Sequence, residues 1–270
     1  MHGRINGCHE RSYALIHKTA IIDAKACLAE DVTVGAYSII GPEVEIDAGT
    51  DIAPHVVING PTRIGKNNKI FQFASIGDAP QDLKYAGEPT RLEIGEHNII
   101  REYVTINRGT VADQGVTRIG DRNLFMAYAH VAHDCTIGSQ TIFANAASLA
   151  GHVTVGDYAT LGGFSCVHQF TTIGPYSFSG LGTVINRDVP PYVITAGNHA
   201  VAYGINKTGL RRHGFSPEVV AMLHKAFRLL IKSHVPRAEA MQQVTPLVQK
   251  CTEVAQFVAF IQNSQRGVVR

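Results

Sequence analysis

Several features that would place a protein in a common class are missing from this sequence. It has no Trp, and among its 270 residues only 7% are aromatic and 17% charged. No apolar run approaches the roughly 20 residues that a membrane helix needs. The first residues, MHGRINGCHERSY, contain no apolar core of a secretory signal. We therefore expect no transmembrane segment, and the usage of cysteine fits a location in the reducing cytoplasm.

Cysteine is scarce and unpatterned. The five cysteines are odd in number, no two form a C-x-x-C, and a disulfide framework or structural zinc site is not expected. The sequence also lacks a phosphate-binding P-loop, a G-x-S-x-G elbow and a dinucleotide fingerprint. We therefore assign no cofactor and no metal, and no covalent enzyme intermediate is required.

Charge is unevenly distributed along the chain. Residues 206–270 hold ten Lys and Arg but three Glu, a net charge of +7, whereas residues 1–205 carry −5. Such a basic module suggests an acidic partner or a ligand that bears phosphate. Its basic residues are not interleaved with stacking aromatics, so we expect no nucleic acid partner.

A six-residue period runs through most of the chain. Aliphatic residues recur at every sixth position from Ile16 to Ile76 and again from Ile94 to Ile106, and after a slip of one residue from Ile119 to Ile185, where Phe125, Phe143 and Ser179 are the exceptions. Helices have a period of 3.6 and flat strands a period of two. Period six indicates short strands joined by corners, with three repeats to each triangular coil, which is a parallel β-helix. Glycine often follows the aliphatic residue, where we expect it to supply unusual corner dihedrals.

Two loops and a change of character divide the chain. The segments 77–93 and 108–118 interrupt the repeat, and loops that break a repeat are commonly functional. Beyond residues 189–191, helical patterns follow Ser216-Pro217-Glu218 and cover 237–250 and 252–263. We predict an N-terminal extension over 1–13, the β-helix over 14–194 and a helical domain over 195–270.

The coil length brings distant histidines to one edge of the prism. Residues one full coil apart lie about 4.8 Å from each other in neighbouring coils, so Gly151 and Gln169 follow His133 in one column. His152 lies one full coil after Asp134. Two further histidines lie close to the column along the chain, His130 and His168.

Such an edge has three interpretations. A histidine can act as general base, with Asp134 to orient the ring and the Gly151 N–H to stabilise an oxyanion. Three histidines can instead hold Zn²⁺ with an open position for water, as in hydratases of the γ-carbonic anhydrase type. A non-enzymatic or ice-binding prism is the third, although the regular Thr ladders of ice-binding faces are missing.

Longer motifs carry a family resemblance. The loop 81–91 (QDLKYAGEPTR) and the stretches 129–138, 149–157, 167–170 and 188–200 resemble the UDP-N-acetylglucosamine O-acyltransferases, which begin lipid A synthesis. The resemblance implies a homotrimer of left-handed β-helices with active sites between subunits. It also implies transfer of an (R)-3-hydroxyacyl group from acyl carrier protein to the glucosamine 3-hydroxyl of UDP-N-acetylglucosamine, with the basic C-terminal quarter as a docking surface for the acidic carrier.

The resemblance assigns roles to individual residues. It implies that His133 is the general base, that Asp134 supports it and that the Gly151 N–H binds the oxyanion. The remaining positions line the sugar and acyl region (Asp82, Lys84, His130 and His152), lie near the nucleotide (His168 and Gln169), or contact uridine and phosphate (Asn206 and Arg212).

Departures from the family pattern concern specificity. Thr208 stands where an acid is frequent, and His213 stands where a second Arg is common. Leu181, with His199, falls where the family limits the acyl cleft, and a side chain bulkier than Gly predicts a chain shorter than C14. The acceptor can be UDP-N-acetylglucosamine or its 3-amino analogue.

Overall fold

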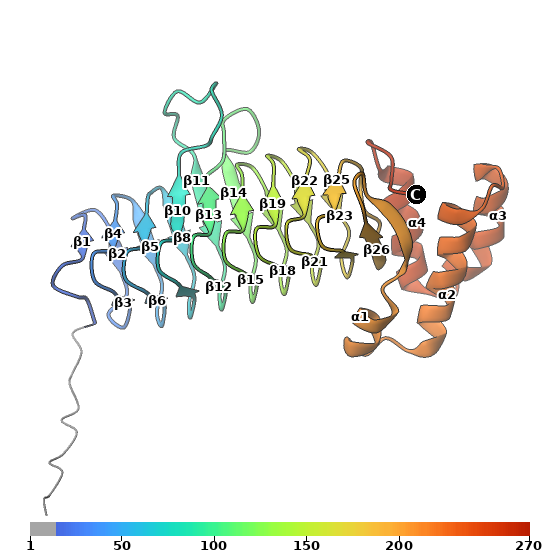
Figure 1. The fold of residues 1–270 in the computed structure, drawn as a ribbon, viewed down its shortest axis with the longest axis horizontal. Coiled ribbons are helices and arrows are strands. Elements are labelled where there is room, and N and C mark those ends of the chain that lie inside the picture. Colours follow the sequence, from blue (N-terminus) through green and yellow to red (C-terminus); the bar gives the residue numbers. More distant parts are fainter. Residues whose placement is uncertain (1–14) are drawn as a thin grey trace, which may run out of the picture.

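The computed structural model describes residues 15–270, so the predicted N-terminal extension lies outside the described part of the chain. Each turn of the chain adds one short strand to each of three sheets, which form a long prism (Figure 1). The nine-stranded sheet contains β1 (Ile21–Ile22), β4 (Ile39–Ile40), β7 (Val57–Ile58), β10 (Ser75–Asp78), β13 (Thr105–Asn107), β16 (His130–Val131), β19 (Ser148–Leu149), β22 (Cys166–Val167) and β25 (Val184–Ile185).

The two other sheets close the prism. The eight-stranded sheet contains β2 (Cys27–Leu28), β5 (Val44–Ile46), β8 (Thr62–Ile64), β11 (Arg91–Ile94), β14 (Val116–Ile119), β17 (Thr136–Ile137), β20 (Thr154–Val155) and β23 (Thr172–Ile173). The ten-stranded sheet contains β3 (Thr33–Val34), β6 (Asp51–Ile52), β9 (Lys69–Ile70), β12 (Ile99–Ile100), β15 (Leu124–Phe125), β18 (Ile142–Phe143), β21 (Thr160–Leu161), β24 (Phe178–Ser179), β26 (Val193–Ala196) and β27 (Val201–Ile205).

The register confirms the predicted coil. Val131 pairs with Leu149 and Leu149 with Val167 in parallel strands, so each pairing spans three six-residue repeats. The side chains of the six-residue repeat are buried inside the prism, from Val34 to Ile185. A single coil buries little apolar surface by itself, so the stacking of coils supplies the core. The predicted left-handed parallel β-helix is therefore the architecture of this chain.

The corners differ from the expectation for glycine. Corner residues with φ near +60° are mostly not glycine, as at Tyr37, Asp134 and His152. The glycines after the aliphatic residues serve a different purpose, because a Cβ at Gly120 would lie 2.7 Å from the Gly138 carbonyl oxygen of the next coil. These glycines allow coils to approach closely, so the expectation of unusual dihedrals is wrong for most of them; Gly77, with φ 74°, is the exception.

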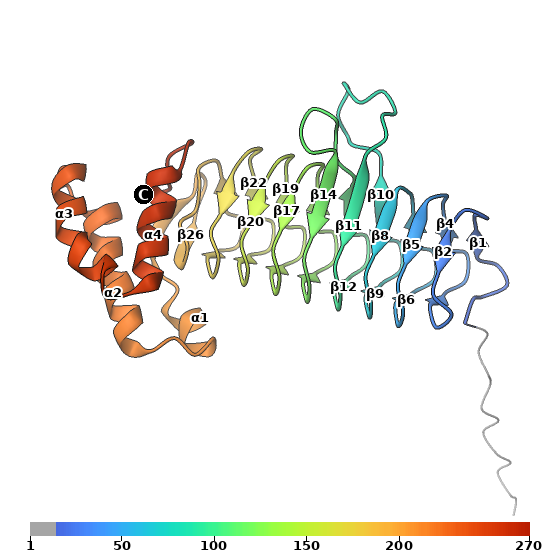
Figure 2. The same cartoon turned by 180° about the vertical axis from the view of Figure 1, so that it is seen from behind.

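Both predicted loops leave the prism at one edge. The segment between β10 and β11 and the segment between β13 and β14 each connect the nine-stranded to the eight-stranded sheet. Figures 1 and 2 show the two loops side by side above the prism. We call the edge between these two sheets the histidine edge, because the corner at 133–134 belongs to it.

A helical domain covers the C-terminal end of the prism. It contains α1 (Lys207–Arg212), α2 (Pro217–Phe227) with a π-helical extension (Arg228–Lys232), α3 (Arg237–Val248) and α4 (Thr252–Asn263). The Ser216 side chain caps α2 by accepting from the Val219 N–H, as the sequence predicts. Strands of the ten-stranded sheet continue to Ile205, so the boundary expected at 194/195 falls inside β26. Within residues 15–270, no helix combines the length and apolar character needed to cross a bilayer.

Candidate active site

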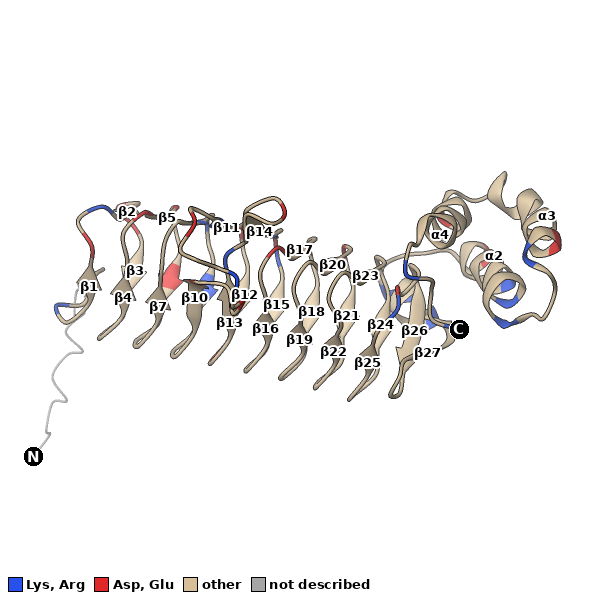
Figure 3. Ribbon diagram, turned by 90° about the horizontal axis from the view of Figure 1, so that it is seen from above, with Lys and Arg blue, Asp and Glu red and all other residues tan. Residues whose placement is uncertain are grey.

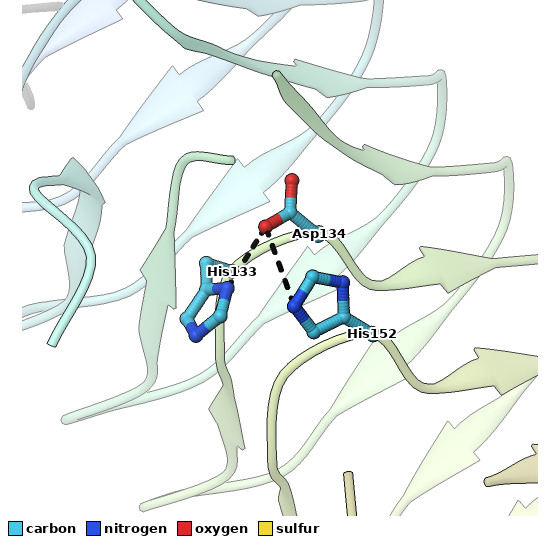
Figure 4. A group of neighbouring side chains, drawn as sticks. All are labelled: His133, Asp134 and His152. Carbon is cyan, nitrogen blue, oxygen red and sulfur yellow. Dashed lines mark hydrogen bonds and ion pairs between the residues drawn. The ribbon is translucent and has the colours of Figure 1, made fainter. Parts of the chain in front are cut away.

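The candidate site is built on successive corners of the histidine edge. Asp134, His152 and Phe170 occupy the same left-handed corner position in three neighbouring coils, with φ values of 58°, 62° and 61°. The predicted column therefore exists, and Figure 4 shows His133, Asp134 and His152 gathered at this edge. The side chains come together because the coil repeats, although residues 133 and 152 are far apart along the chain.

His133 and Asp134 form a hydrogen-bonded pair. The Nδ1 atom of His133 lies 2.9 Å from Oδ2 of Asp134, whose side chain is only 1% exposed. Thr110 completes the environment of the carboxylate: its N–H donates to both oxygens at 2.9 and 3.1 Å, and its hydroxyl donates to Oδ2 at 2.6 Å. A buried charge needs such partners. The carboxylate can only accept, so Nδ1 of His133 carries the proton and Nε2 is free to act as a base.

Gly151 allows the ring of His133 to sit against the next coil. A Cβ at this position would lie 2.6 Å from Cε1 and 2.7 Å from Nε2 of His133. Only glycine leaves room for the imidazole in this place. Among the hydrogen bonds of the described residues, none uses the Gly151 N–H, so this donor is free beside Nε2.

His152 has a carboxylate of its own. Its Nδ1 atom lies 3.0 Å from Oδ2 of Asp113, on the loop between β13 and β14. The ring stacks on Phe170 at 4.3 Å between centroids and meets His133 edge-on at 5.0 Å. Its Nε2 atom lies 3.9 Å from Asp134, beyond hydrogen-bond distance.

His130 lies on β16 beside the pair. Its Nδ1 atom is 2.7 Å from the Thr105 hydroxyl of the preceding coil. Burial first, and then the neighbouring His133, lower the pKa of His130 below its ordinary value. His130 is therefore neutral at neutral pH and can exchange hydrogen bonds with a polar ligand without adding charge.

Asp82 and Lys84 lie on the loop between β10 and β11. The Asp82 carboxylate accepts from the Lys84 N–H at 2.9 Å, which forms a turn. The loop is anchored by Arg108, whose guanidinium donates to the Gly77 carbonyl at 2.9 Å and to the Tyr85 hydroxyl at 3.1 Å. Within residues 15–270, no hydrogen bond or ion pair joins this pair to the histidines.

His168 and Gln169 lie farther along the same edge. The Nδ1 atom of His168 is 3.1 Å from the Gln169 carbonyl oxygen and 3.2 Å from Nη2 of Arg266. Both residues are exposed. The structure thus keeps them on the histidine edge, in the same coil as Phe170, and no hydrogen bond within the described residues joins them to the His133–Asp134 pair.

Asn206 and Arg212 lie on a different edge. Asn206 caps α1 by accepting from the Gly209 N–H, and it donates to the Tyr176 carbonyl at 3.1 Å. Tyr176 stacks on Tyr158 at the edge between the eight- and ten-stranded sheets. Arg212 is exposed in the last turn of α1. Within the chain the structure does not bring this pair to the histidines.

Leu181 is exposed at the corner between β24 and β25. Its Cδ1 atom would lie 3.2 Å from a Cβ at Gly163, in the preceding coil. The segment that carries His199 adjoins β25, because the Ala200 N–H donates to the Val184 carbonyl. Leu181 and His199 therefore belong to neighbouring coils at the C-terminal end of the prism.

Three residues that organise the site were not predicted from the sequence: Arg108, Thr110 and Asp113. All three lie in the loop where the six-residue phase slips by one position. The slip marked the loop, but no periodicity indicates which of its side chains points to the prism. Nearby, burial raises the pKa of Cys135 to about 12, so this thiol is no nucleophile.

The same atoms could be arranged around a metal ion. Ligand atoms of His133, Asp134 and His152 all lie within 4.8 Å of one another. Hydrogen bonds already account for this proximity. Asp134 accepts from Thr110 and His133, and Asp113 accepts from His152. The Nε2 atoms of His133 and His152 have no hydrogen-bond partner among the described residues.

A prism of hexapeptide coils with a carboxylate-supported histidine at its corner defines a β-helical acyltransferase. Comparisons with known proteins identify the particular one. A family model described as Udp N-acetylglucosamine O-acyltransferase, Domain 2, matches residues 188–269. The acyl-[acyl-carrier-protein]–UDP-N-acetylglucosamine O-acyltransferase of Halorhodospira halophila is 55% identical over 255 residues, which is 94% of this chain and 99% of the relative.

Solved structures agree. The UDP-N-acetylglucosamine O-acyltransferase of Moraxella catarrhalis matches with a TM-score of 0.92 and 47% identity, over 95% of this chain and all of that one. Among the curated relatives, the acyl-[acyl-carrier-protein]–UDP-N-acetylglucosamine O-acyltransferase of Thiobacillus denitrificans is 51% identical, over 95% of this chain and its own full length. The chain belongs to the UDP-N-acetylglucosamine O-acyltransferase family. Family membership does not favour the zinc hydratase.

Proposed function

We propose that the protein transfers an (R)-3-hydroxyacyl group from acyl carrier protein to the glucosamine 3-hydroxyl of UDP-N-acetylglucosamine, the first step of lipid A synthesis, with His133 as general base. The names of the two relatives above give acyl-[acyl-carrier-protein] as the acyl donor and UDP-N-acetylglucosamine as the acceptor. The observation that carries the assignment of the base is the 2.9 Å contact between Nδ1 of His133 and buried Asp134, which leaves Nε2 free.

The chemistry follows from that geometry. Nε2 of His133 takes the proton of the sugar hydroxyl while its oxygen attacks the thioester carbonyl. Asp134 stabilises the imidazolium that forms, and the Gly151 N–H donates to the oxyanion of the tetrahedral intermediate. Collapse of the intermediate expels the carrier's thiolate, which receives the proton from His133. The products are the ester and the free thiol, and no covalent enzyme intermediate is formed.

A homotrimer is part of the proposal. Asp82, Lys84, Asn206 and Arg212 lie away from the histidines within one protomer, yet the family resemblance assigns all of them to substrate. A second copy whose loop and helical domain face the histidine edge would complete the set. His168 and Gln169, farther along that edge, are then placed to meet the nucleotide.

The basic helical domain supports docking of acyl carrier protein. His224 lies among basic residues, and its pKa is lowered by burial and then by Lys207 and Arg228. A shallow cavity of about 350 Å³ beside it is lined by Lys225, Arg228 and Leu229. Figure 3 shows Lys and Arg on α2, at the end of the prism. An acidic protein with an apolar contact suits this surface.

Acyl length is assigned to Leu181, with His199 beside it. The Leu181 side chain projects from its corner and the residue is 78% exposed, so it occupies space that a longer chain would need. We therefore propose a donor shorter than C14. A cytoplasmic location is proposed on cysteine usage: in the described residues the four cysteines are free.

One assay tests the reaction. Purified protein is incubated with UDP-N-acetylglucosamine or its 3-amino analogue and with C10, C12 or C14 3-hydroxyacyl carrier proteins, and product is measured by mass spectrometry. We expect an O-acylated product with the shorter donors. Fastest transfer from C14 contradicts the length proposal, and product only with the analogue contradicts the acceptor. No product with any pair contradicts the function.

A further inference from the structure

The two histidines at the site differ in the carboxylate that holds them. His133 is paired with Asp134, which is buried in the prism, whereas His152 is paired with Asp113, which comes from the loop between β13 and β14. Because a carboxylate only accepts hydrogen bonds, the 3.0 Å contact places a proton on Nδ1 of His152. In the neutral ring, Nε2 is then an acceptor.

Packing also constrains the orientation of this ring. Phe170 covers one face at 4.3 Å with an interplanar angle of 7°, and the backbone N–H of His152 donates to the His133 carbonyl at 3.0 Å. The side chain is 13% exposed. Rotation about the last side-chain bond is the remaining freedom, and the hydrogen bond to Asp113 removes it.

Asp134 does not compete for His152. Its Oδ2 atom already receives the Thr110 hydroxyl and His133, and lies 3.9 Å from Nε2 of His152. Thr110 and Asp113 belong to the same loop. The loop thus divides the cluster into two separate histidine–carboxylate pairs, both with Nδ1 turned to the carboxylate.

We infer that Asp113 is a positioning residue for His152, and that it holds Nε2 as a hydrogen-bond acceptor for a substrate hydroxyl. Both substrates of the proposed reaction carry such a group, the sugar hydroxyls and the 3-hydroxyl of the acyl chain. The inference rests on the proposed function and deepens it. It gives the loop a role in recognition, since a hydroxyl that donates to Nε2 distinguishes a substrate from an analogue without it.

A double-mutant cycle tests this role. Michaelis constants for UDP-N-acetylglucosamine and for the 3-hydroxyacyl carrier protein are measured for wild type, Asp113→Ala, His152→Ala and the double variant. We expect Asp113→Ala to raise the Michaelis constant for one of the two substrates about fivefold, while kcat stays within about twofold of the wild-type value. A higher Michaelis constant for UDP-N-acetylglucosamine assigns the contact to a sugar hydroxyl, and a higher constant for the carrier protein assigns it to the 3-hydroxyl of the acyl chain. In the His152→Ala background the same change has no effect, because Asp113 acts through the ring.

Controls separate positioning from folding. Gln114→Ala changes the next loop residue, whose side chain contacts Arg118 at 2.6 Å, and leaves both constants unchanged. Asp113→Asn keeps an oxygen that accepts from Nδ1 and retains most of the wild-type affinity. Nitrogen NMR of the His152 ring reports a proton on Nδ1 in wild type and a mixture of tautomers in Asp113→Ala.

Two results overturn the inference. Equal effects of Asp113→Ala with and without His152 show that the aspartate does not act through the ring. Unchanged Michaelis constants for both substrates show that the contact has no role in recognition. Either result leaves the wild-type reaction and the function of His133 intact, so failure here is distinct from failure of the proposed function.

Discussion

Two edges of the prism use one backbone conformation for different purposes. At the edge between the ten- and nine-stranded sheets, left-handed corner positions carry Tyr37, His55, Phe73, Tyr103 and Tyr128, whose rings stack at 4.8 to 5.4 Å. At the histidine edge the same position carries Asp134, His152 and Phe170. We call the first of these the aromatic edge.

The difference arises from what surrounds the corner. Along the aromatic edge each ring meets mainly the ring of the next coil. At the histidine edge two long loops leave the prism and return, and one of them supplies Thr110 and Asp113 as hydrogen-bond partners. Stacked rings offset the cost of a left-handed corner with packing. Loop partners instead convert the corner into a set of oriented acid–base groups. The repeat therefore determines position, and the loops determine chemistry.

The largest test of this comparison removes the base. His133→Ala is expected to lower kcat/KM by about 10²–10⁴-fold, since the attacking hydroxyl loses its proton acceptor. The matched control, His97→Ala, removes an exposed corner histidine with φ 57° from the third edge and is expected to keep full activity. Steady-state kinetics with both substrates measure the two variants. Comparable activity of His133→Ala and wild type would show that the histidine edge is no more catalytic than the others.

The coil and part of the candidate site could be predicted from the sequence, whereas the loop contacts could not. The six-residue period predicts the coil, and coil arithmetic places His133, Gly151 and His152 together, because identical coils leave few alternatives. Thr110 and Asp113 could not be predicted, since an aperiodic loop has no register that indicates where a side chain points. The short α1 also escaped prediction: its six residues, KTGLRR, include a glycine and show no apolar period. The position of Asn206 depends on how that helix packs.

A second test crowds the base without removing it. Gly151→Ala places a Cβ 2.6 to 2.7 Å from the His133 ring, which has to move. A displacement approaching 1 Å costs about 10²-fold in rate when it affects the reacting groups. Gly204→Ala is the control, because its Cβ meets nothing within 4 Å. Turnover of Gly151→Ala close to that of Gly204→Ala would mean that the approach of ring and glycine has no part in catalysis.

A third test concerns the loop. Thr110→Val removes the hydroxyl that donates to Oδ2 of Asp134 at 2.6 Å but keeps the backbone N–H bonds. A buried carboxylate with one donor fewer holds His133 less firmly, and we expect about a tenfold loss in kcat/KM. Thr110→Ser retains the hydroxyl and should recover most of the rate. Equal rates for the valine and serine variants would assign the effect to packing rather than to the hydrogen bond.

The smallest effect is expected at the aromatic edge, and it concerns stability rather than rate. His55 stacks between Tyr37 and Phe73 at 5.2 and 5.4 Å. His55→Ala interrupts the stack and should lower the free energy of unfolding by about 1 kcal/mol, whereas His55→Phe retains a ring and should not. Thermal unfolding followed by circular dichroism measures both variants, and initial rates are measured beside it. A loss of activity in His55→Ala as large as that of Thr110→Val, with an unchanged unfolding midpoint, would contradict the difference between the two edges, because it would place chemistry beside His55, where the structure shows stacked rings.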